Sequence, residues 1–466
     1  MILSYKEKLN MKEIPQPVNT SETKFLVTFF DKLNYNKITY AVLRNYKYLP
    51  YDLKGSDIDL FVCEDDFKKF HKILKETAEQ FNGYEISILR TPTVKDVSVS
   101  GFYDNEWWGV RFDTFTYIGT NECSIFANNY ITDRIEYHNS LKVVSKNDAD
   151  VLGFIKELIG AKKYSKRYSE GALKAYVNAQ EQYYKAFCET LPIDIVTSYL
   201  IPLLKDELLF SEKICFIIYN GYKSKSLKNG IKSDLLNAIS NYKYKLKRLV
   251  DTPGFSIAIL GTDGSGKTTI INSLIPLLEK PLHNKIVYSH MRPNMLPNIA
   301  QLFGKPKVEG PNTKPHNGQV SGVIISALRL LYYSFDYIIG YWIIVNTTLA
   351  KKTTIWFFDR YYYDYLIDQK RASINLPIWV IKFIGIFIPK PDLILCLGTD
   401  PNLIHSRKPE LPLNEVKIQV MKLKEFCLEK DNAVWVDTGN KSIESTVDYA
   451  MNQIIINMAN RYKNKS

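Results

Sequence analysis

The 466-residue chain is poor in the residues that build disulfide frameworks and zinc sites, with only 6 cysteines and 6 histidines. The cysteines do not form the closely spaced pairs that are typical of zinc sites. Several of them lie in apolar runs such as "LILCLG", where a buried free thiol is the simplest interpretation. We therefore expect a reducing compartment and a cytoplasmic protein.

The sequence also lacks the marks of secretion and of a membrane anchor. Its first residues, "MILSYKEKLNMKEIPQ", contain neither a long apolar core nor a small-residue cleavage site, so we expect no signal peptide. One apolar stretch, residues 323–345, is long enough to cross a bilayer. However, Arg329 and Asp336 lie near its middle, where each charge would be costly in hydrocarbon. We predict a buried helix of a soluble domain and no membrane span.

The formal net charge is +12, and an excess of positive charge favours anionic partners. No segment concentrates this charge, and no motif that reads RNA or DNA is present. We interpret the lysines as a solvated surface, predict no specific nucleic-acid partner, and expect small-molecule ligands.

The length suggests two to four domains, and the pattern of residues divides the chain. After an N-terminal segment (1–23), residues 24–145 read as mixed α/β and residues 146–250 as a helical connector with little strand signal. The turn "DTPG" opens the last region, 251–466, where strands and helices alternate. Such alternation predicts a parallel sheet with helices on both faces.

Individual elements can be placed within these regions. In the first α/β region, residues 64–83 have helical spacing of apolar residues, with Gly83 as the expected helix end. In the last region, the expected strands are 255–261, 284–290, 354–359, 392–398 and 433–437.

The stretch "AILGTDGSGKTTIINSL" carries the most specific signal. Gly261, Gly266, Lys267 and Thr268 fit the phosphate-loop pattern, with an apolar strand before it and an amphipathic helix after it. Glycines, including Gly264, let the backbone N–H groups face a phosphate, and the start of the helix adds its positive end. Lys267 would bridge the outer phosphates of a nucleoside triphosphate, and the Thr268 hydroxyl would ligate Mg²⁺.

With these motifs, residues 255–460 resemble thymidylate kinases and their relatives among the nucleoside-monophosphate kinases. "GTDGSGKTT" looks like the family's loop, and "WFFDRYYYDYLID" looks like its Asp-Arg motif at a strand end. "PKPDLILCLGTDPNLIHSRK" resembles the next strand, followed by a helix and a basic lid, and "AVWVDTGNKSIESTVDYAMNQI" resembles the closing strand, base-side loop and helix. The resemblance implies a P-loop α/β fold, with ATP as phosphoryl donor and Mg²⁺ as cofactor.

The resemblance also implies roles for individual residues. Asp359 would hold Mg²⁺ with Thr268, Arg407 would lie in the lid over the transferred group, and Lys267, Asp359, Arg360 and Arg407 would form the catalytic set. The acceptor would contact Asp263, Arg292 and Arg360. The ATP-binding residues would be Gly261, Asp263, Gly264, Ser265, Gly266, Lys267, Thr268 and Thr269.

The acceptor itself stays open. Residues 291–318 are longer and richer in proline than the family's counterpart, and they lack its deoxynucleoside-recognition pattern. The resemblance implies as acceptor a nucleoside monophosphate such as dTMP, or another small metabolite. A nucleotide-dependent ATPase or switch is the alternative activity, and a homodimer is left open.

A second acidic motif lies near the start of the chain. "KGSDIDLFV" places Asp57 and Asp59 two apart on an expected strand, and "GVRFDTFTY" offers Asp113 as a third carboxylate for a metal pair. This pattern resembles the nucleotidyltransferase fold. Arg44 and Asn45 stand where that fold has a Gly-Ser turn, so an active domain and a degenerate docking domain both stay open.

Overall fold

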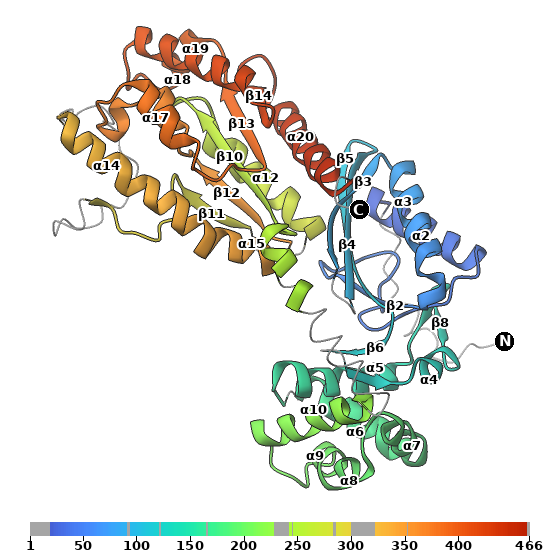
Figure 1. Cartoon of the computed structure of the whole chain (residues 1–466). Coiled ribbons are helices and arrows are strands. Elements are labelled where there is room, and N and C mark those ends of the chain that lie inside the picture. Colours follow the sequence, from blue (N-terminus) through green and yellow to red (C-terminus); the bar gives the residue numbers. More distant parts are fainter. Residues whose placement is uncertain are drawn as a thin grey trace. The chain divides into compact units, whose positions relative to one another are not determined.

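The computed structural model describes residues 19–90, 94–120, 123–164, 166–227, 242–244, 246–282, 286–299, 322–351 and 353–463. The chain forms two compact units, Met1–Lys245 and Leu246–Ser466 (Figure 1). Most of the proline-rich insertion, residues 300–321, lies outside the described residues.

The first unit is built on a seven-stranded mixed sheet with the order β3-β4-β5-β2-β1-β9-β8. Strand β2 runs antiparallel to β1 and parallel to β5. A separate hairpin joins β6 and β7. The strands are β1 (Tyr40–Val42), β2 (Ile58–Val62), β3 (Gly83–Arg90), β4 (Val94–Tyr103), β5 (Glu106–Phe115), β6 (Ile118–Thr120), β7 (Cys123–Phe126), β8 (Glu136–His138) and β9 (Leu141–Val143).

Two hydrophobic cores cover the two faces of this sheet. On one face, α2 (Ser21–Tyr35) and α3 (Phe67–Gln80) pack in an aromatic core around Trp108. On the other face, Leu43 and Phe61 share a core with the helices that follow the sheet, so the predicted connector packs directly on the α/β region. Those helical segments are α4 (Asn128–Thr132), α5 (Lys146–Lys156), η2 (Glu157–Ala161), α6 (Lys166–Asn178), α7 (Gln180–Thr190), α8 (Ile193–Ile195), η3 (Val196–Leu200), α9 (Ile201–Leu204) and α10 (Glu212–Leu227).

Gly83 was expected to end the helix of residues 64–83, and this prediction is wrong. The helical segment consists of the one-turn helix η1 (Glu64–Asp66) followed by α3, which ends at Gln80. Gly83 is the first residue of β3. A Cβ atom on Gly83 would lie 2.5 Å from the ring of Trp108. The glycine is therefore explained by close packing against an indole rather than by a helix cap.

The second unit contains a fully parallel five-stranded sheet with the order β11-β12-β10-β13-β14, as the alternating pattern predicts. β10 is central, and the strand order reverses beside it, so the carboxyl ends of β10 and β12 form the crevice where α/β proteins bind ligands. The strands are β10 (Phe255–Gly261), β11 (Val287–His290), β12 (Ile355–Asp359), β13 (Leu393–Gly398) and β14 (Ala433–Asp437).

Helices cover both faces of this sheet (Figure 1). α12 (Lys267–Leu282) and α20 (Ile443–Lys463) pack against each other, and α19 (Leu413–Glu429) contacts β13 and β14. The remaining helical segments are α14 (Val323–Phe335), η4 (Asp336–Asn346), α15 (Thr347–Lys351), α16 (Asp364–Ile367), η5 (Lys370–Ala372), α17 (Ile378–Gly385) and α18 (Pro401–Arg407).

The apolar stretch of residues 323–345 forms part of a continuous helix, Val323–Lys351, but the prediction that it is buried is wrong for most of its length. Only 33% of an apolar 18-residue segment of this helix is buried. Apolar side chains lie on all sides of the helix, whereas one side of it packs in the core. Within the described residues, it is the one helix long and apolar enough to cross a membrane, which by itself is weak evidence. Its exposed apolar side chains are Val323, Ile324, Ile325, Leu328, Leu331, Phe335, Trp342 and Ile343.

Candidate active site

The phosphate-loop residues lie between the end of β10 and the start of α12. Gly264 and Gly266 have φ angles of +85° and +86°, which favour glycine at both positions. A Cβ atom on Gly261 would lie 2.6 Å from the carbonyl oxygen of Leu397 on the neighbouring strand. The loop therefore depends on all three glycines, and the exposed side chains of Thr268 and Thr269 follow it at the helix start.

Lys267 is buried under the loop that it follows. Its ammonium donates to the carbonyl oxygens of Gly261 (3.0 Å) and Thr262 (2.9 Å). Burial, together with the nearby Arg360 charge, lowers the pKa of Lys267 from its ordinary 10.5 to about 7, although the surrounding carboxylates oppose the shift. A polyphosphate at the loop would restore the charged form.

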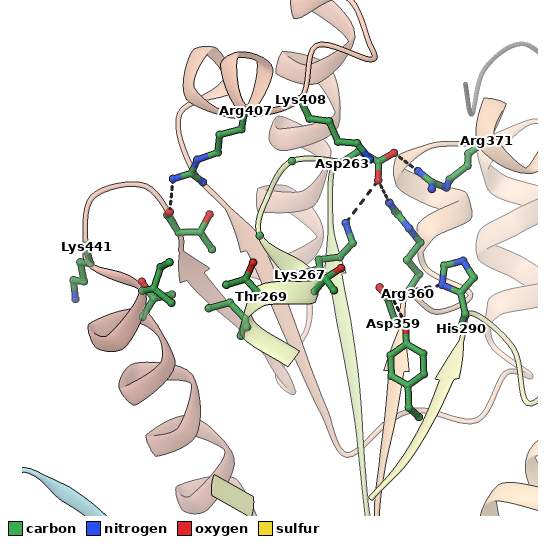
Figure 2. Close-up of a pocket in the computed structure, with 18 residues that line it drawn as sticks. Asp263, Lys267, Thr269, His290, Asp359, Arg360, Arg371, Arg407, Lys408 and Lys441 are labelled. Carbon is green, nitrogen blue, oxygen red and sulfur yellow. Dashed lines mark hydrogen bonds and ion pairs between the residues drawn. The ribbon is translucent and has the colours of Figure 1, made fainter. Parts of the chain in front are cut away.

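Asp263 links the loop to two arginines. Its carboxylate accepts from Arg360 Nη2 at 2.5 Å and from Arg371 Nη1, and it lies 3.9 Å from Lys267 Nζ (Figure 2). Burial would raise the pKa of Asp263, but the three cations outweigh burial and hold it well below its ordinary range. The carboxylate is thus the anion around which these cations are arranged.

Arg360 follows directly after β12 and is held in a left-handed conformation (φ +72°). Its backbone N–H donates to Ile259 of the central strand, and its side chain, which is 4% exposed, also pairs with Asp364 at 3.0 Å. An arginine buried this deeply keeps its charge only with such partners, and the interactions raise its pKa despite burial. Its guanidinium is therefore fixed in place.

Asp359 ends β12 beside the loop. Its Oδ2 accepts from the Tyr288 hydroxyl at 2.7 Å and lies 3.7 Å from His290 Nδ1, whereas its Oδ1 is buried and accepts no hydrogen bond among the described residues. Burial would raise the pKa of Asp359, but His290, Tyr288 and Lys267 lower it to about 2. A carboxylate with a free, buried oxygen that lines the same cavity as Thr268 fits a Mg²⁺ site.

These residues line one cavity of about 820 Å³ at the carboxyl ends of the strands. On the far side from Asp263, the backbone carbonyl of Thr438 accepts from Arg407 at 2.9 Å, and Lys441 lies nearby (Figure 2). The cavity is lined by Asp263, Gly264, Gly266, Lys267, Thr268, Thr269, Ile270, Tyr288, His290, Asp359, Arg360, Arg371, Arg407, Lys408, Thr438, Lys441, Ile443 and Thr446.

Arg292 is the one predicted acceptor residue that does not line the cavity. It is 5% exposed, pairs with the fully buried Asp336 at 2.6 Å, and stacks over the Tyr333 ring. Asp336 also accepts from two backbone N–H groups, so this pair acts as a brace for the segment after β11. In the described structure the Arg292 guanidinium therefore binds Asp336 and not the cavity.

Sequence reasoning missed several lining residues. Tyr288 and His290 lie at the carboxyl end of β11, and that position in a parallel sheet is the signal that could have found them. Lys441 and Ile443 lie in the loop and first turn after β14, a segment that the family resemblance covers although it singles out neither residue. Next to Arg407, Lys408 pairs with Glu410 at 3.1 Å.

The acidic motif of the first unit is arranged differently from the expected strand pair. Asp57 precedes β2, whereas Asp59 lies on it, opposite Asp113 of β5. Arg44 pairs with Asp59 at 2.5 Å, and Arg111 pairs with Asp113 at 2.9 Å and with Asp96 at 3.0 Å. Among the described residues, no group of three or more histidine, cysteine, aspartate or glutamate side chains has a metal-binding arrangement.

Burial changes the pKa of a carboxylate in this cluster. Burial, together with Asp96, raises the pKa of Asp113 to about 8, although Arg111 opposes the shift. Arg44 thus pairs with Asp59, and Arg111 pairs with Asp113. The metal role of Asp57, Asp59 and Asp113 stays a prediction.

Comparison with known proteins links part of the chain to nucleotide kinases. No family model matches the sequence. A solved thymidylate kinase from Ehrlichia chaffeensis matches 43% of this chain and 98% of its own at 15% identity and a TM-score of 0.30, which is too low to establish a shared fold. A curated relative, a probable thymidylate kinase from Pyrobaculum aerophilum, is 29% identical over 151 residues, which make up 32% of this chain and 68% of the relative. The chain is therefore similar in sequence to a thymidylate kinase over about a third of its length.

Proposed function

We propose that the second unit is an ATP-dependent kinase that transfers the γ-phosphoryl group to a small anionic acceptor. One observation carries this proposal: a single cavity joins the phosphate loop to two further cations, Arg360 and Arg371, which pair with Asp263 of the loop. The loop needs only Lys267 and its backbone to hold a triphosphate. Arg360 and Arg371 are not needed for the triphosphate, so we assign them to a second anion that replaces Asp263, which a simple hydrolase does not need.

In this proposal ATP lies along the cavity from the loop toward Thr438 and Ile443. The backbone N–H groups around Gly264 and Gly266 cradle its phosphates, and Lys267 donates to the outer ones. Thr268 and the free oxygen of Asp359 would hold Mg²⁺, which neutralises charge on the phosphates.

The acceptor binds at the Asp263 side of the cavity. Its phosphate replaces the Asp263 carboxylate as the partner of Arg360 and Arg371, since a guanidinium fork suits phosphate oxygens as well as carboxylate oxygens. Arg371 takes the second place that the family resemblance gives to Arg292. A nucleoside monophosphate such as dTMP, or another small phosphorylated metabolite, has the required charge.

A nucleotide-dependent ATPase or switch is the alternative activity. A screen of ADP production by the full chain, over nucleoside monophosphates, sugars and polyol phosphates, separates the two. We expect ADP formation to rise steeply with one acceptor and to vanish in Lys267→Ala, while Lys280→Ala, an exposed lysine of the same helix, retains activity. ADP formation that no acceptor accelerates would favour the ATPase, and full activity in folded Lys267→Ala would exclude both activities at this loop.

ATP binding should take up a proton near pH 8.5. The unliganded Lys267 amine has a pKa of about 7 and is mostly neutral at that pH, whereas a bound polyphosphate raises its pKa toward the ordinary value. Calorimetry in buffers of different ionisation enthalpy should give an uptake approaching about one proton per ATP. Lys267→Met should abolish the uptake, and an equal uptake in that variant would assign it to another group.

Arg371 should control acceptor affinity. Arg371→Ala removes one of two charged donors to the acceptor, so the acceptor KM should rise about tenfold or more while the ATP KM changes little. Lys370→Ala is the matched control, because Lys370 is 57% exposed and pairs with Glu415 outside the cavity. Equal acceptor KM values in the two variants would remove Arg371 from the acceptor site.

Arg407 should act on the transition state. It is exposed and lines the cavity, and among the described residues its guanidinium donates only to a backbone carbonyl, so it is available to bind phosphoryl oxygens. Arginines in this role are worth about 10³–10⁵ in kcat, and we expect Arg407→Ala to lower kcat by at least about a hundredfold with little change in ATP Kd. A kcat near that of the unaltered protein would leave Lys408 as the lid cation.

A further inference from the structure

The first unit contains a cavity that the acidic motif does not use. It has a volume of about 300 Å³ and lies between the end of β1 and the helices α5, η2 and α6. Its polar lining comes from Arg44, Lys156, Glu157 and Tyr168, and Leu152 and Gly153 supply apolar surface. All of these residues belong to one compact unit, so the cavity is formed by that unit alone.

Arg44 brings a fixed positive charge to this cavity. Its Nε and Nη2 atoms lie 2.5 and 3.2 Å from the two oxygens of Asp59, a bidentate arrangement that sets the plane of the guanidinium. Its side chain is 41% exposed although Asp59 is buried. Arg44 thus lines the cavity while its guanidinium pairs with Asp59 and also interacts with Tyr168.

Lys156 brings a second positive charge. It is the last residue of α5, and its ammonium lies 4.5 Å from the centre of the Phe115 ring. Among the described residues no ion pair with a carboxylate is found for this ammonium, although Asp59 and Asp113 are near enough to act on its charge. Burial lowers the pKa of Lys156, so an anion bound beside it would compensate a desolvation cost that the protein leaves in place.

Glu157 adds an unused hydrogen-bond acceptor. Its Oε2 atom is buried and has no hydrogen-bond partner in the described part of the chain. A buried carboxylate oxygen without a donor is costly, and a ligand hydroxyl group would satisfy it. The cavity therefore offers two cations for an anionic group and one acceptor for a hydroxyl group.

We propose that this cavity binds a small phosphorylated polyol or sugar without a divalent metal. The phosphate lies between Arg44 and Lys156, and a hydroxyl group of the same molecule donates to Glu157. Phosphate is favoured over a carboxylate because a phosphate monoester has three terminal oxygens, which can accept from both Arg44 and Lys156. No metal is needed because Arg44 already balances Asp59.

Calorimetry on the full chain tests this site. The parent protein carries Lys267→Ala to weaken phosphate binding at the loop of the second unit, and the buffer contains EDTA. The probes are inorganic phosphate, glycerol 3-phosphate and glucose 6-phosphate, with glycerol and glucose as uncharged controls. We expect at least one phosphorylated polyol to bind more tightly than inorganic phosphate, and the uncharged compounds not to bind.

Variants then locate the binding. Lys156→Gln should weaken it about tenfold or more, Lys156→Arg should restore part of it, and Lys174→Gln, an exposed lysine of α6 that does not line the cavity, should leave it unchanged. Circular dichroism and thermal unfolding confirm that each variant is folded. If Lys156→Gln proves unfolded, the Lys156→Arg and Glu157→Gln variants carry the test, and both should weaken binding of the phosphorylated polyol.

Three outcomes would overturn the proposal. The first is that no phosphorylated probe binds, and the second is that the Lys156 and Glu157 variants leave the binding unchanged. The third is binding that appears only with Mg²⁺ or Mn²⁺ and is lost in Asp59→Asn. The last outcome would instead support the metal-dependent interpretation of the acidic motif. None of these measurements depends on kinase turnover, so they are independent of the function proposed for the second unit.

Discussion

The candidate active site depends on a buried arginine that cannot lose its charge. Arg360 follows β12 at the crevice of the parallel sheet, and Asp263 and Asp364 compensate its desolvation. Asp263 comes from the phosphate loop, so the same ion pair ties this loop to the end of β12. An acceptor phosphate that displaces this carboxylate would release the loop aspartate at the moment when both substrates are bound.

The sequence predicted the second unit well because its signals are local. Apolar strands alternate with helices, and all five predicted strands form the parallel sheet. Glycines with positive φ at positions 264 and 266 follow from the loop pattern. The positions of Asp359 and Arg360 at one strand end required only that parallel strands end at a common edge.

What the sequence could not provide are pairings between distant residues. Nothing local indicates that Asp336 would engage Arg292, that Arg371 would reach Asp263, or that Arg44 would cover Asp59. The length and apolar character of the helix Val323–Lys351 were likewise readable, but which of its sides reaches the core depends on tertiary packing. Gly83 shows the same limit, since its neighbour Trp108 lies 25 residues away in the sequence.

The central claim is that Asp263 occupies the place of an acceptor anion, and phosphate affinity tests it most directly. Calorimetry would compare phosphate binding by Lys156→Gln and by Lys156→Gln/Asp263→Asn. Both proteins carry Lys156→Gln so that the cavity of the first unit contributes little to the phosphate binding that is measured. Removing the competing carboxylate should strengthen inorganic phosphate binding severalfold, and adding Arg371→Ala should reverse the gain. Phosphate binding that is unchanged or weaker after Asp263→Asn in a folded protein would contradict the account.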